Sequence, residues 1–422
     1  MKRIMIFCNI LSLVLAAMTI SCGIEPNDNG GGKTAKERVD IQLTKVQQQI
    51  GYNANAFTFD FLEAVCANED DGTNIFCSPF SIQMALAMTA AGAAGPTQRE
   101  MYDAIGFTGF TGADVSDFYE TLIPALQDVD NTTTFEIANS FWAKKAITIK
   151  PDYTREIQKA FCAEINALPD DSAQAAGAIN GWCAQATHGM ITKIVDEIPA
   201  DLMVSLLNAI YFKGTWKDQF DKSRNTEDKF TCWDGSTVKT TFMNHTFDRA
   251  RVYSDEYVEA MSVPYGNGAF SMTIVVPRSG VAIGKVLAGL DADTWSLYRD
   301  GGRWFETHLS MPKFEEEYAA EKLCIEILQD MGMNLAFTGA ADFSAMSDTP
   351  LCIDEIRHKA KIKVDEEGTE AAAVTYIGMR VTSVGPTADT FYFKADKPFL
   401  YFISECSSGE ILFAGVKNSF KN

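Results

Sequence analysis

The order of helical and strand patterns along the chain constrains its fold more than any other feature. The stretch "NAFTFDFLEAVC" has the apolar spacing of a buried helix stripe, formed by Phe57, Phe61, Leu62 and Val65. A second helix is predicted for "SPFSIQMALAMTAAGAAG", where Pro79 suits a first turn and Gly92 lies near the end. The first half of the chain is therefore mainly helical.

The second half is dominated by strand patterns. The stretches "LMVSLLNAIYFKGTW" and "AFSMTIVVP" are typical of buried strands. The tail "KPFLYFISECSSGEILFAGVKN" predicts two apolar strands joined by a turn at Ser407-Ser408-Gly409. Helices followed by strands indicate an α+β fold rather than alternating βαβ units.

The N-terminus has the features of an export signal. Lys2 and Arg3 precede an apolar run over residues 4–20, and "SCG" follows it. We expect a signal peptide over residues 1–21, a lipidated Cys22 as in bacterial lipoproteins, and a tether over residues 22–36; a plain secretory signal is the alternative. The run is too short for a permanent spanning helix. A single domain is expected over residues 37–422.

The net charge of the chain excludes some classes of partner but does not identify one. The 422 residues carry a net charge of −20 with 46% hydrophobic residues, which is enough for a large core. A strongly acidic chain is a poor electrostatic partner for nucleic acid or an anionic membrane. We therefore expect no nucleic-acid partner, and membrane contact only through a lipid anchor.

Eight cysteines follow Cys22, and none of them belongs to a CxxC pair or a short Cys/His cluster. The sequence therefore predicts no metal site and no cofactor, and most of these cysteines are expected to be buried free thiols. The common catalytic motifs are also missing, including G-x-S-x-G, H-E-x-x-H and the P-loop. A hydrolase would have to use an unrecognised site, which substitution of His188 or His358 would test.

Five stretches together resemble the serpin family. They are "NIFCSPFSIQMALAMTAAGAAGPT", "LLNAIYFKGTWKDQF", "HLSMPKF", "VDEEGTEAAA" and "FKADKPFLYFISECSSGEILFAGVKN". They occur in the family's order and span nearly all of the chain after residue 40. The resemblance implies a serpin fold with three β-sheets, eight or nine helices and an exposed reactive-centre loop over about residues 366–390. It also implies a monomer that traps serine or cysteine proteases.

The implied mechanism explains a conflict in "VDEEGTEAAAVTYIGMRVTS", where helix-favouring residues precede β-branched and aromatic ones. In the family, the target protease cleaves the loop, forms an acyl-enzyme and is carried along as the loop inserts into the central sheet. Small residues suit the first part of such a strand, and Gly368 supplies a pivot. The implied hinge comprises Glu366, Glu367, Gly368, Thr369, Glu370, Ala371, Ala372 and Ala373.

The resemblance also assigns residues that control insertion. Those matching the shutter beneath the parting strands are Ser78, Ser81, Asn208 and His358, and those matching the breach at the hinge are Lys313, Glu366 and Trp216. Each has a simpler interpretation as well. Ser78 is placed to cap the helix begun by Pro79, and Lys313 with Glu366 would form a surface pair of little energetic value.

The position of the cleaved bond stays open. Counting seventeen residues from Glu366, as is usual in the family, gives Thr382–Ser383. A small residue before the bond suits an elastase-like or subtilisin-like protease. The stretch "SVGPTADTF" is longer than usual in the family, so the register of the cleaved bond is uncertain. Cleavage after Arg380 would suit a trypsin-like enzyme, and cleavage after Met379 would suit a chymotrypsin-like one.

Two further alternatives remain at this point. A non-inhibitory serpin would bind a small molecule or a protein, and its loop would be cleaved without trapping the protease. The hydrolase hypothesis predicts that the chain turns over a substrate and does not inhibit a protease. In either case the leader places the chain outside the cytoplasm, lipid-anchored to the bacterial outer membrane or cell surface, or secreted.

Overall fold

The computed structural model describes residues 36–199, 201–320, 323–369 and 389–420. Residues Thr34–Asn422 form one compact unit. The helices of the described part are α1 (Lys45–Asn68), α2 (Pro79–Ala90), α3 (Gly95–Ala104), α4 (Gly112–Asp128), α5 (Pro151–Phe161), α6 (Ser172–Ala186), α7 (Ile283–Leu287), α8 (Ala292–Asp300) and α9 (Leu323–Asp330), with 3₁₀ turns at Lys222–Arg224 and Leu335–Phe337. None of these described helices is both long and apolar enough to cross a membrane.

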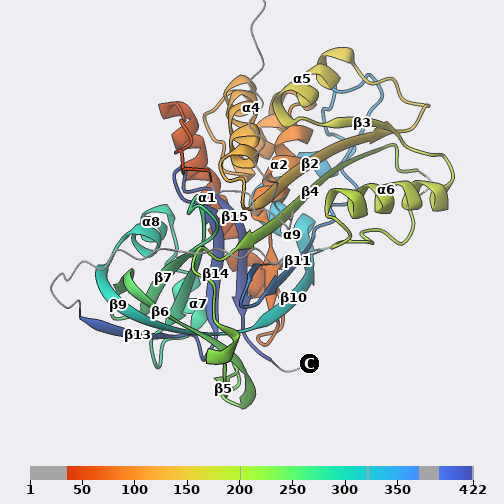
Figure 1. The fold of residues 1–422 in the computed structure, drawn as a ribbon. Coiled ribbons are helices and arrows are strands. Elements are labelled where there is room, and N and C mark those ends of the chain that lie inside the picture. Colours follow the sequence, from red (N-terminus) through yellow and green to blue (C-terminus); the bar gives the residue numbers. More distant parts are fainter. Residues whose placement is uncertain (1–35, 200, 321–322, 370–388, 421–422) are drawn as a thin grey trace, which may run out of the picture. The chain divides into compact units, whose positions relative to one another are not determined.

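The strands are β1 (Ile75–Cys77), β2 (Thr134–Ala143), β3 (Glu164–Ala167), β4 (Val204–Thr215), β5 (Thr226–Thr231), β6 (Thr237–Ser254), β7 (Val258–Pro264), β8 (Phe270–Pro277), β9 (Arg303–Pro312), β10 (Phe314–Ala319), β11 (Lys359–Val364), β12 (Gly368–Thr369), β13 (Thr390–Lys394), β14 (Phe399–Glu405) and β15 (Ile411–Lys417). Figure 1 shows β2 and β4 running side by side, with α2, α5 and α6 around them.

The sheet that contains the first residues of the predicted hinge has the order β10-β11-β12-β4-β2-β3. Strand β4 pairs antiparallel with β2 from Val204 to Lys213. Its other edge receives the short strand β12, which also pairs with β11. Two residues of the predicted hinge thus lie as a strand between β4 and β11.

The remaining described strands form one hydrogen-bonded set of nine, in the order β1-β15-β14-β8-β7-β6-β9-β13 with β5 on β6. The resemblance implies three β-sheets, whereas the described strands form two hydrogen-bonded sets. The reason is β6, which is 18 residues long and pairs with β7 near one end and with β5 and β9 over the rest. The α+β class, with nine α-helices in the described part, is confirmed.

Opposite faces of β4 pack against different layers. Leu206 packs against the main core, to which α2 contributes, whereas Leu207 joins a smaller cluster with residues of α6 such as Ala175 and Ile179. This follows from the alternation of side chains along a strand. Helices α2 and α6 therefore cover the two faces of the central sheet.

The predicted elements are confirmed at the positions that the sequence indicated. The helix from "NAFTFDFLEAVC" is part of α1, and α2 begins at Pro79 with Ser78 as its N-cap. The eight cysteines in the described part are free thiols. Six of them are buried or half-buried, as expected, whereas Cys162 and Cys352 are exposed.

The turn between β14 and β15 is held by Glu405. Its two carboxylate oxygens accept hydrogen bonds of 2.7–2.9 Å from the backbone N–H and the hydroxyl groups of Ser407 and Ser408. Gly409 completes the turn with a φ of 77°, which favours glycine. The "SSG" turn chemistry predicted from the sequence thus depends on a buried carboxylate beside it.

Substitution Glu405→Gln is expected to lower the free energy of unfolding by about 2–3 kcal/mol, because one acceptor oxygen becomes a donor facing Ser407 or Ser408. Denaturant unfolding measures the change. The matched control is Glu197→Gln, at an exposed residue, and should leave the unfolding midpoint unchanged. Equal midpoints for both variants would contradict this role for Glu405.

Candidate functional site

The candidate site begins with a tight turn that leads from β11 into β12. The backbone N–H of Asp365 donates to the carbonyl of Gly368 at 3.0 Å, and the N–H of Gly368 donates back at 3.3 Å. The turn is tied to the chain after β4, because Trp216 N–H donates to the Glu367 carbonyl at 2.9 Å and Phe220 N–H to the Glu366 carbonyl at 3.1 Å. The start of the loop is therefore held at the end of β4.

Gly368 lies where no side chain fits. A Cβ atom there would be 2.0 Å from the carbonyl oxygen of Gly214, and the φ of Gly368 is 154°. Gly214 is enclosed as well. A Cβ atom placed on it would be 2.8 Å from ring atoms of Phe212 and Tyr265. Two glycines thus allow the close approach of β12 to β4.

An aromatic pair covers this approach. The rings of Trp216 and Tyr265 stack with centroids 4.3 Å apart and an interplanar angle of 11°. Trp216 donates its indole N–H to the carbonyl of Asp365 at 2.8 Å. The hydroxyl groups of Tyr265 and Thr369 are hydrogen-bonded at 2.6 Å, and Thr369 is 3% exposed. The Thr369 side chain therefore points into the protein, toward Tyr265.

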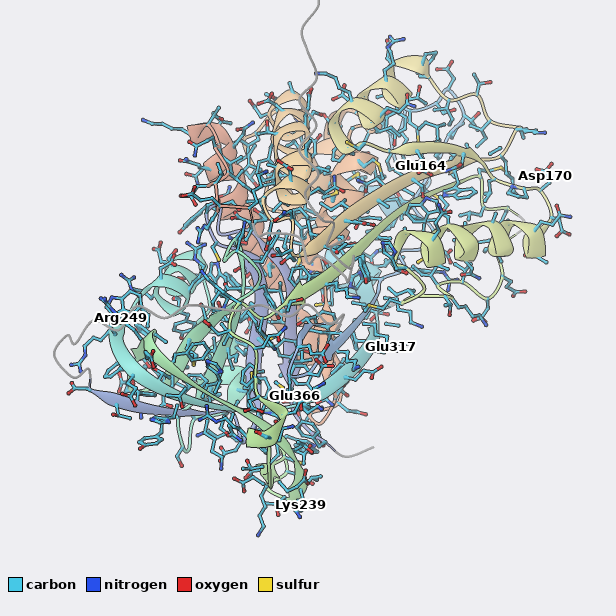
Figure 2. The ribbon with its side chains drawn as sticks, in the orientation of Figure 1. Glu164, Asp170, Lys239, Arg249, Glu317 and Glu366 are labelled. Carbon is cyan, nitrogen blue, oxygen red and sulfur yellow. The ribbon has the colours of Figure 1, made fainter. Side chains whose placement is uncertain are left out.

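Glu366 makes the ion pair that the sequence indicated. Its carboxylate lies 3.0 Å from the ammonium nitrogen of Lys313 and also accepts a hydrogen bond from the amide of Asn225. Burial raises the pKa of Glu366, but the hydrogen bonds and the Lys313 charge outweigh it, so the pKa is lowered overall. Figure 2 shows Glu366 close to the β5–β6 hairpin.

The simpler interpretation of this pair as a surface contact does not fit its environment. The Glu366 side chain is only 2% exposed, although that of Lys313 is 39% exposed. A buried carboxylate that lost its partner would be left with an uncompensated charge, which is costly. The neighbouring Glu367 has a more exposed pair, with Lys222 at 2.8 Å. Glu366 and Glu367 are thus both bonded to the segment that follows β4, through Asn225 and Lys222.

A second polar cluster lies beneath the middle of β4. Ser78 N–H donates to His358 Nε2 at 3.0 Å, and the Ser78 hydroxyl donates to the carbonyl of Leu412 at 2.6 Å. Ser81 and Asn208 are hydrogen-bonded through their side chains. The Ser78 hydroxyl also accepts from Ser81 N–H at 3.1 Å, so this residue caps α2 as well. All four predicted shutter residues are therefore brought together.

His358 is neutral in this cluster. Because Nε2 accepts the Ser78 N–H, it carries no proton, and the side chain is nearly fully buried. Burial lowers the pKa of His358 to about 4. The imidazole thus acts as a fixed acceptor between α2 and the start of β11.

Sequence reasoning missed several residues of the site. Asn139 on β2 accepts from the Asn208 amide at 2.7 Å and donates to the Phe161 carbonyl at 2.7 Å. Tyr265 and Asn225 were not singled out, and no local pattern marks them. Glu370, Ala371, Ala372 and Ala373, together with Met379, Arg380, Thr382, Ser383 and Cys22, lie outside the described residues.

This geometry defines a class of protein whose central sheet accepts the start of its own loop as a strand. The family described as Serpin (serine protease inhibitor) matches residues 52–419. The chain belongs to the serpin family.

Individual relatives agree over most of the chain. Iripin-3 of Ixodes ricinus is 32% identical, with 82% of this chain and 89% of that protein aligned. The intracellular coagulation inhibitor 2 of Tachypleus tridentatus is also 32% identical, over 82% and 86% of the two chains.

Among solved structures, the thermophilic serpin tengpin in its native state matches with a TM-score of 0.78 and 28% identity, covering 92% of this chain and 98% of that one. Human thyroxine-binding globulin in complex with its hormone has a TM-score of 0.80 at 23% identity, covering 89% of this chain and all of that one. The second likeness shows the fold alone.

The lowered pKa of His358 predicts acid sensitivity. An imidazole that is neutral in the folded chain but titrates near 6.5 when unfolded stabilises the fold fully above pH 6.5. That stability is lost as pH falls from about 6.5 toward 4, by up to about 3 kcal/mol. Denaturant unfolding at pH 7.5, 5.5 and 4.5 measures the loss.

The variant His358→Gln retains an acceptor for Ser78 but does not titrate. Its unfolding midpoint should fall less than that of the wild type over the same pH range, and His308→Gln, at a half-exposed residue, is the matched control. Parallel pH curves for the wild type and His358→Gln would show that this imidazole is not the cause.

Proposed function

We propose that this chain inhibits serine proteases of the elastase-like or subtilisin-like kind by trapping them as acyl-enzymes. The observation that supports this most directly is the position of β12. Gly368 and Thr369 already pair with β4 on one side, and Thr369 pairs with β11 on the other. The loop that follows them would lengthen this strand once it is cut.

The proposed chemistry takes place at the bond between Thr382 and Ser383. The serine hydroxyl of the protease adds to the carbonyl carbon of Thr382, the peptide C–N bond breaks, and Ser383 leaves with a free amino group after receiving a proton. The protease is then held as an ester on Thr382. Insertion of the residues before Thr382 would carry the ester-linked protease away from the hinge and distort its active site before water hydrolyses the ester.

The structure disfavours the hydrolase alternative at His358. A general base must reach its substrate, whereas this ring is buried and its Nε2 is occupied by the Ser78 N–H. His188 is exposed and pairs with Glu136 at 2.9 Å while its ring lies against Tyr211. We interpret His188 as part of a surface contact.

The expected result is a complex that resists denaturation. Incubating the full chain with elastase-like, subtilisin-like and trypsin-like proteases in turn should give a band at the summed mass on a denaturing gel. Mass spectrometry of the released C-terminal fragment identifies the cleaved bond, with Ser383 first under this proposal. A fragment that begins at Val381 would assign the bond to Arg380 and favour a trypsin-like target.

Substitution Thr369→Arg should turn the inhibitor into a substrate. Thr369 is buried against Tyr265, so an arginine there would prevent β12 from lying between its neighbours. The protease should still cleave the loop, but the covalent band should be lost. Thr237→Arg, at an exposed strand position, is the matched control and should retain the complex. Cleavage without a complex in the wild type would overturn the proposal.

We also propose that the chain is exported and anchored through a lipid on Cys22. The support is the basic and apolar leader that ends at Ser21-Cys22-Gly23. In a bacterial host, Cys22→Ala should move the protein from the membrane fraction to the soluble exported fraction, as measured by fractionation and immunoblotting. Equal distribution of the two forms would contradict lipidation.

A further inference from the structure

The turn between β14 and β15 contains two buried carboxyl groups in opposite environments. Glu405 is fully buried, and its two oxygens accept four hydrogen bonds from Ser407 and Ser408. Glu410, at the other end of the turn, is 2% exposed, and no hydrogen bond or ion pair of its carboxyl group is found among the described residues. The hydroxyl groups of the turn thus serve one acid and leave the other without a donor.

The surroundings of Glu410 are apolar on the side of α1 and α4. A Cβ atom placed on Gly51 of α1 would be 3.1 Å from Glu410 Oε2 and 3.8 Å from the ring of Phe118 on α4. Figure 1 shows α1 beside β15, which begins directly after Glu410. Tyr119 on α4 is fully buried among phenylalanine rings, and its hydroxyl group has no hydrogen-bond partner among the described residues. Burial, and second the charge of Glu410, raise the pKa of Tyr119.

The cationic side chains near the turn have other partners. Arg299 on α8 lies against the turn, but its guanidinium group pairs with Asp300 at 2.5 Å. Arg38, in the segment before α1, pairs with Asp40 at 3.1 Å. Neither of these two cations therefore compensates a charge on Glu410.

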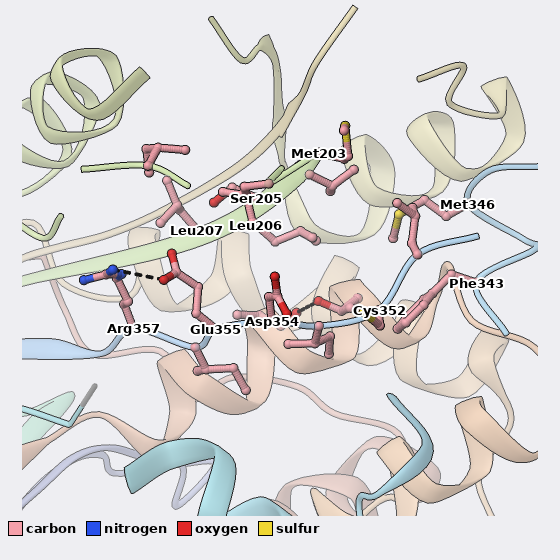
Figure 3. A pocket seen from close by; sticks show the side chains of 18 of the residues that line it. Met203, Ser205, Leu206, Leu207, Phe343, Met346, Cys352, Asp354, Glu355 and Arg357 are labelled. Carbon is pink, nitrogen blue, oxygen red and sulfur yellow. Dashed lines mark hydrogen bonds and ion pairs between the residues drawn. The ribbon is translucent and has the colours of Figure 1, made fainter. Parts of the chain in front are cut away.

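Other enclosed acids of the described chain have a cation beside them. The nearly buried Glu316 pairs with Lys417. Next to the first residues of β4, Glu355 lines a cavity and pairs with Arg357 at 2.9 Å, as the dashed line in Figure 3 shows. The unpaired state of Glu410 is therefore a distinctive feature of its position.

A carboxyl group in this environment is expected to hold its proton, because an ionised group without donors is far more costly to bury than a neutral one. Burial, and second the negative charge of Glu405, raise the pKa of Glu410 from 4.5 to about 8. When the turn opens, water hydrates the carboxyl group, and the pKa returns to its ordinary value. The closed turn therefore binds one proton more than the open turn between pH 4.5 and pH 8.

Opening of the turn would separate three parts of the molecule. Asn55 on α1 accepts a hydrogen bond from the Ile411 N–H at 3.0 Å. The N–H of Ile41, in the segment before α1, donates to the Ser407 hydroxyl at 2.9 Å. Movement of Glu410 into water would disturb both contacts, because they lie on either side of it along the turn.

We propose that the β14–β15 turn is a proton-dependent latch, in which neutral Glu410 closes the turn onto α1 and the segment before it, and loss of the proton to water opens the turn. The closed form is most favoured below pH 4.5 and becomes less favoured as pH rises toward 8. Above pH 8 this group has no further effect. The latch does not depend on the proposed inhibition of a protease.

Hydrogen exchange on the full chain tests the latch, because the Ile411 N–H exchanges when its bond to Asn55 opens. After correction for the intrinsic exchange rate, the opening constant should rise about tenfold per pH unit, or roughly thirtyfold from pH 6.0 to 7.5, since opening releases one proton. Glu410→Gln has no proton to release, so its opening constant should stay the same. An equal pH dependence in both forms would overturn the proposal.

Two control variants assign the effect to one acid. Glu405→Gln weakens the turn by another route, so its exchange should be faster at every pH while the tenfold slope is retained. Loss of the slope in this variant would assign the proton to Glu405 and contradict the latch. Glu63→Gln, at an exposed residue of α1, should behave like the wild type.

Infrared spectroscopy at pH 7 detects the proton without requiring the turn to open. The difference spectrum between the wild type and Glu410→Gln should contain the C=O stretching band of one neutral carboxyl group. Glu410→Met, with a side chain of similar length and no proton, should give the same band and replaces Glu410→Gln if that variant does not fold. A difference spectrum without the band would show that Glu410 is ionised, and the proposal would fail.

Discussion

The structure depends on one constraint, which is that the backbone of a strand inside a sheet must have partners on both edges. An unpaired buried N–H or C=O group costs about 1–3 kcal/mol. Strand β4 satisfies one edge through β2 along ten residues. At its other edge Gly214 and Thr215 pair with β12, which connects β4 to β11. A segment that pairs with this edge of β4 must therefore offer the backbone of a strand, and Gly368 and Thr369 do so at Gly214 and Thr215.

Two polar clusters on β4 define the ends of the region where such a strand would begin. The hinge cluster at Gly214–Trp216 fixes the turn through Trp216, Tyr265 and Glu366. The shutter cluster is centred on Asn208, six residues earlier and about 20 Å away along the strand. Both clusters bond to backbone or side-chain groups of elements on either side of β4, so movement of the sheet has to break specific contacts and not only apolar packing.

Much of this arrangement could be predicted from the sequence, because apolar periodicity and capping residues act locally. The helices, the final hairpin and the cap at Ser78 are of this kind. The pair of Lys313 with Glu366 followed from the family resemblance, since 53 residues separate the two and no local pattern connects them. Tyr265 and Asn225 could not be found, because their roles arise only when the turn after β7 and the start of β5 meet the hinge.

The described strands form two connected sets rather than three separate sheets for a related reason. Strand periodicity gives the faces of a strand but not its partners, and β6 exchanges partners along its length after a register shift between Phe247 and Ala250. A bulge of this type bends and twists a strand. It lets one strand contribute to two layers, which a pattern of alternating residues does not reveal.

The register of β4 also bears on the uncertain position of the cleaved bond under the proposed mechanism. A strand continuing from Thr369 would bring Thr382 level with Asp201, and Arg380 level with Met203, just before β4 begins at Val204. Cleavage at either residue would therefore leave the ester at the far end of the same strand, roughly 36–43 Å from the hinge. The distance moved by the protease depends on the length of β4 more than on which of the two bonds is cut. The cleaved bond thus decides which protease is attacked, whereas the sheet decides how far that protease is carried.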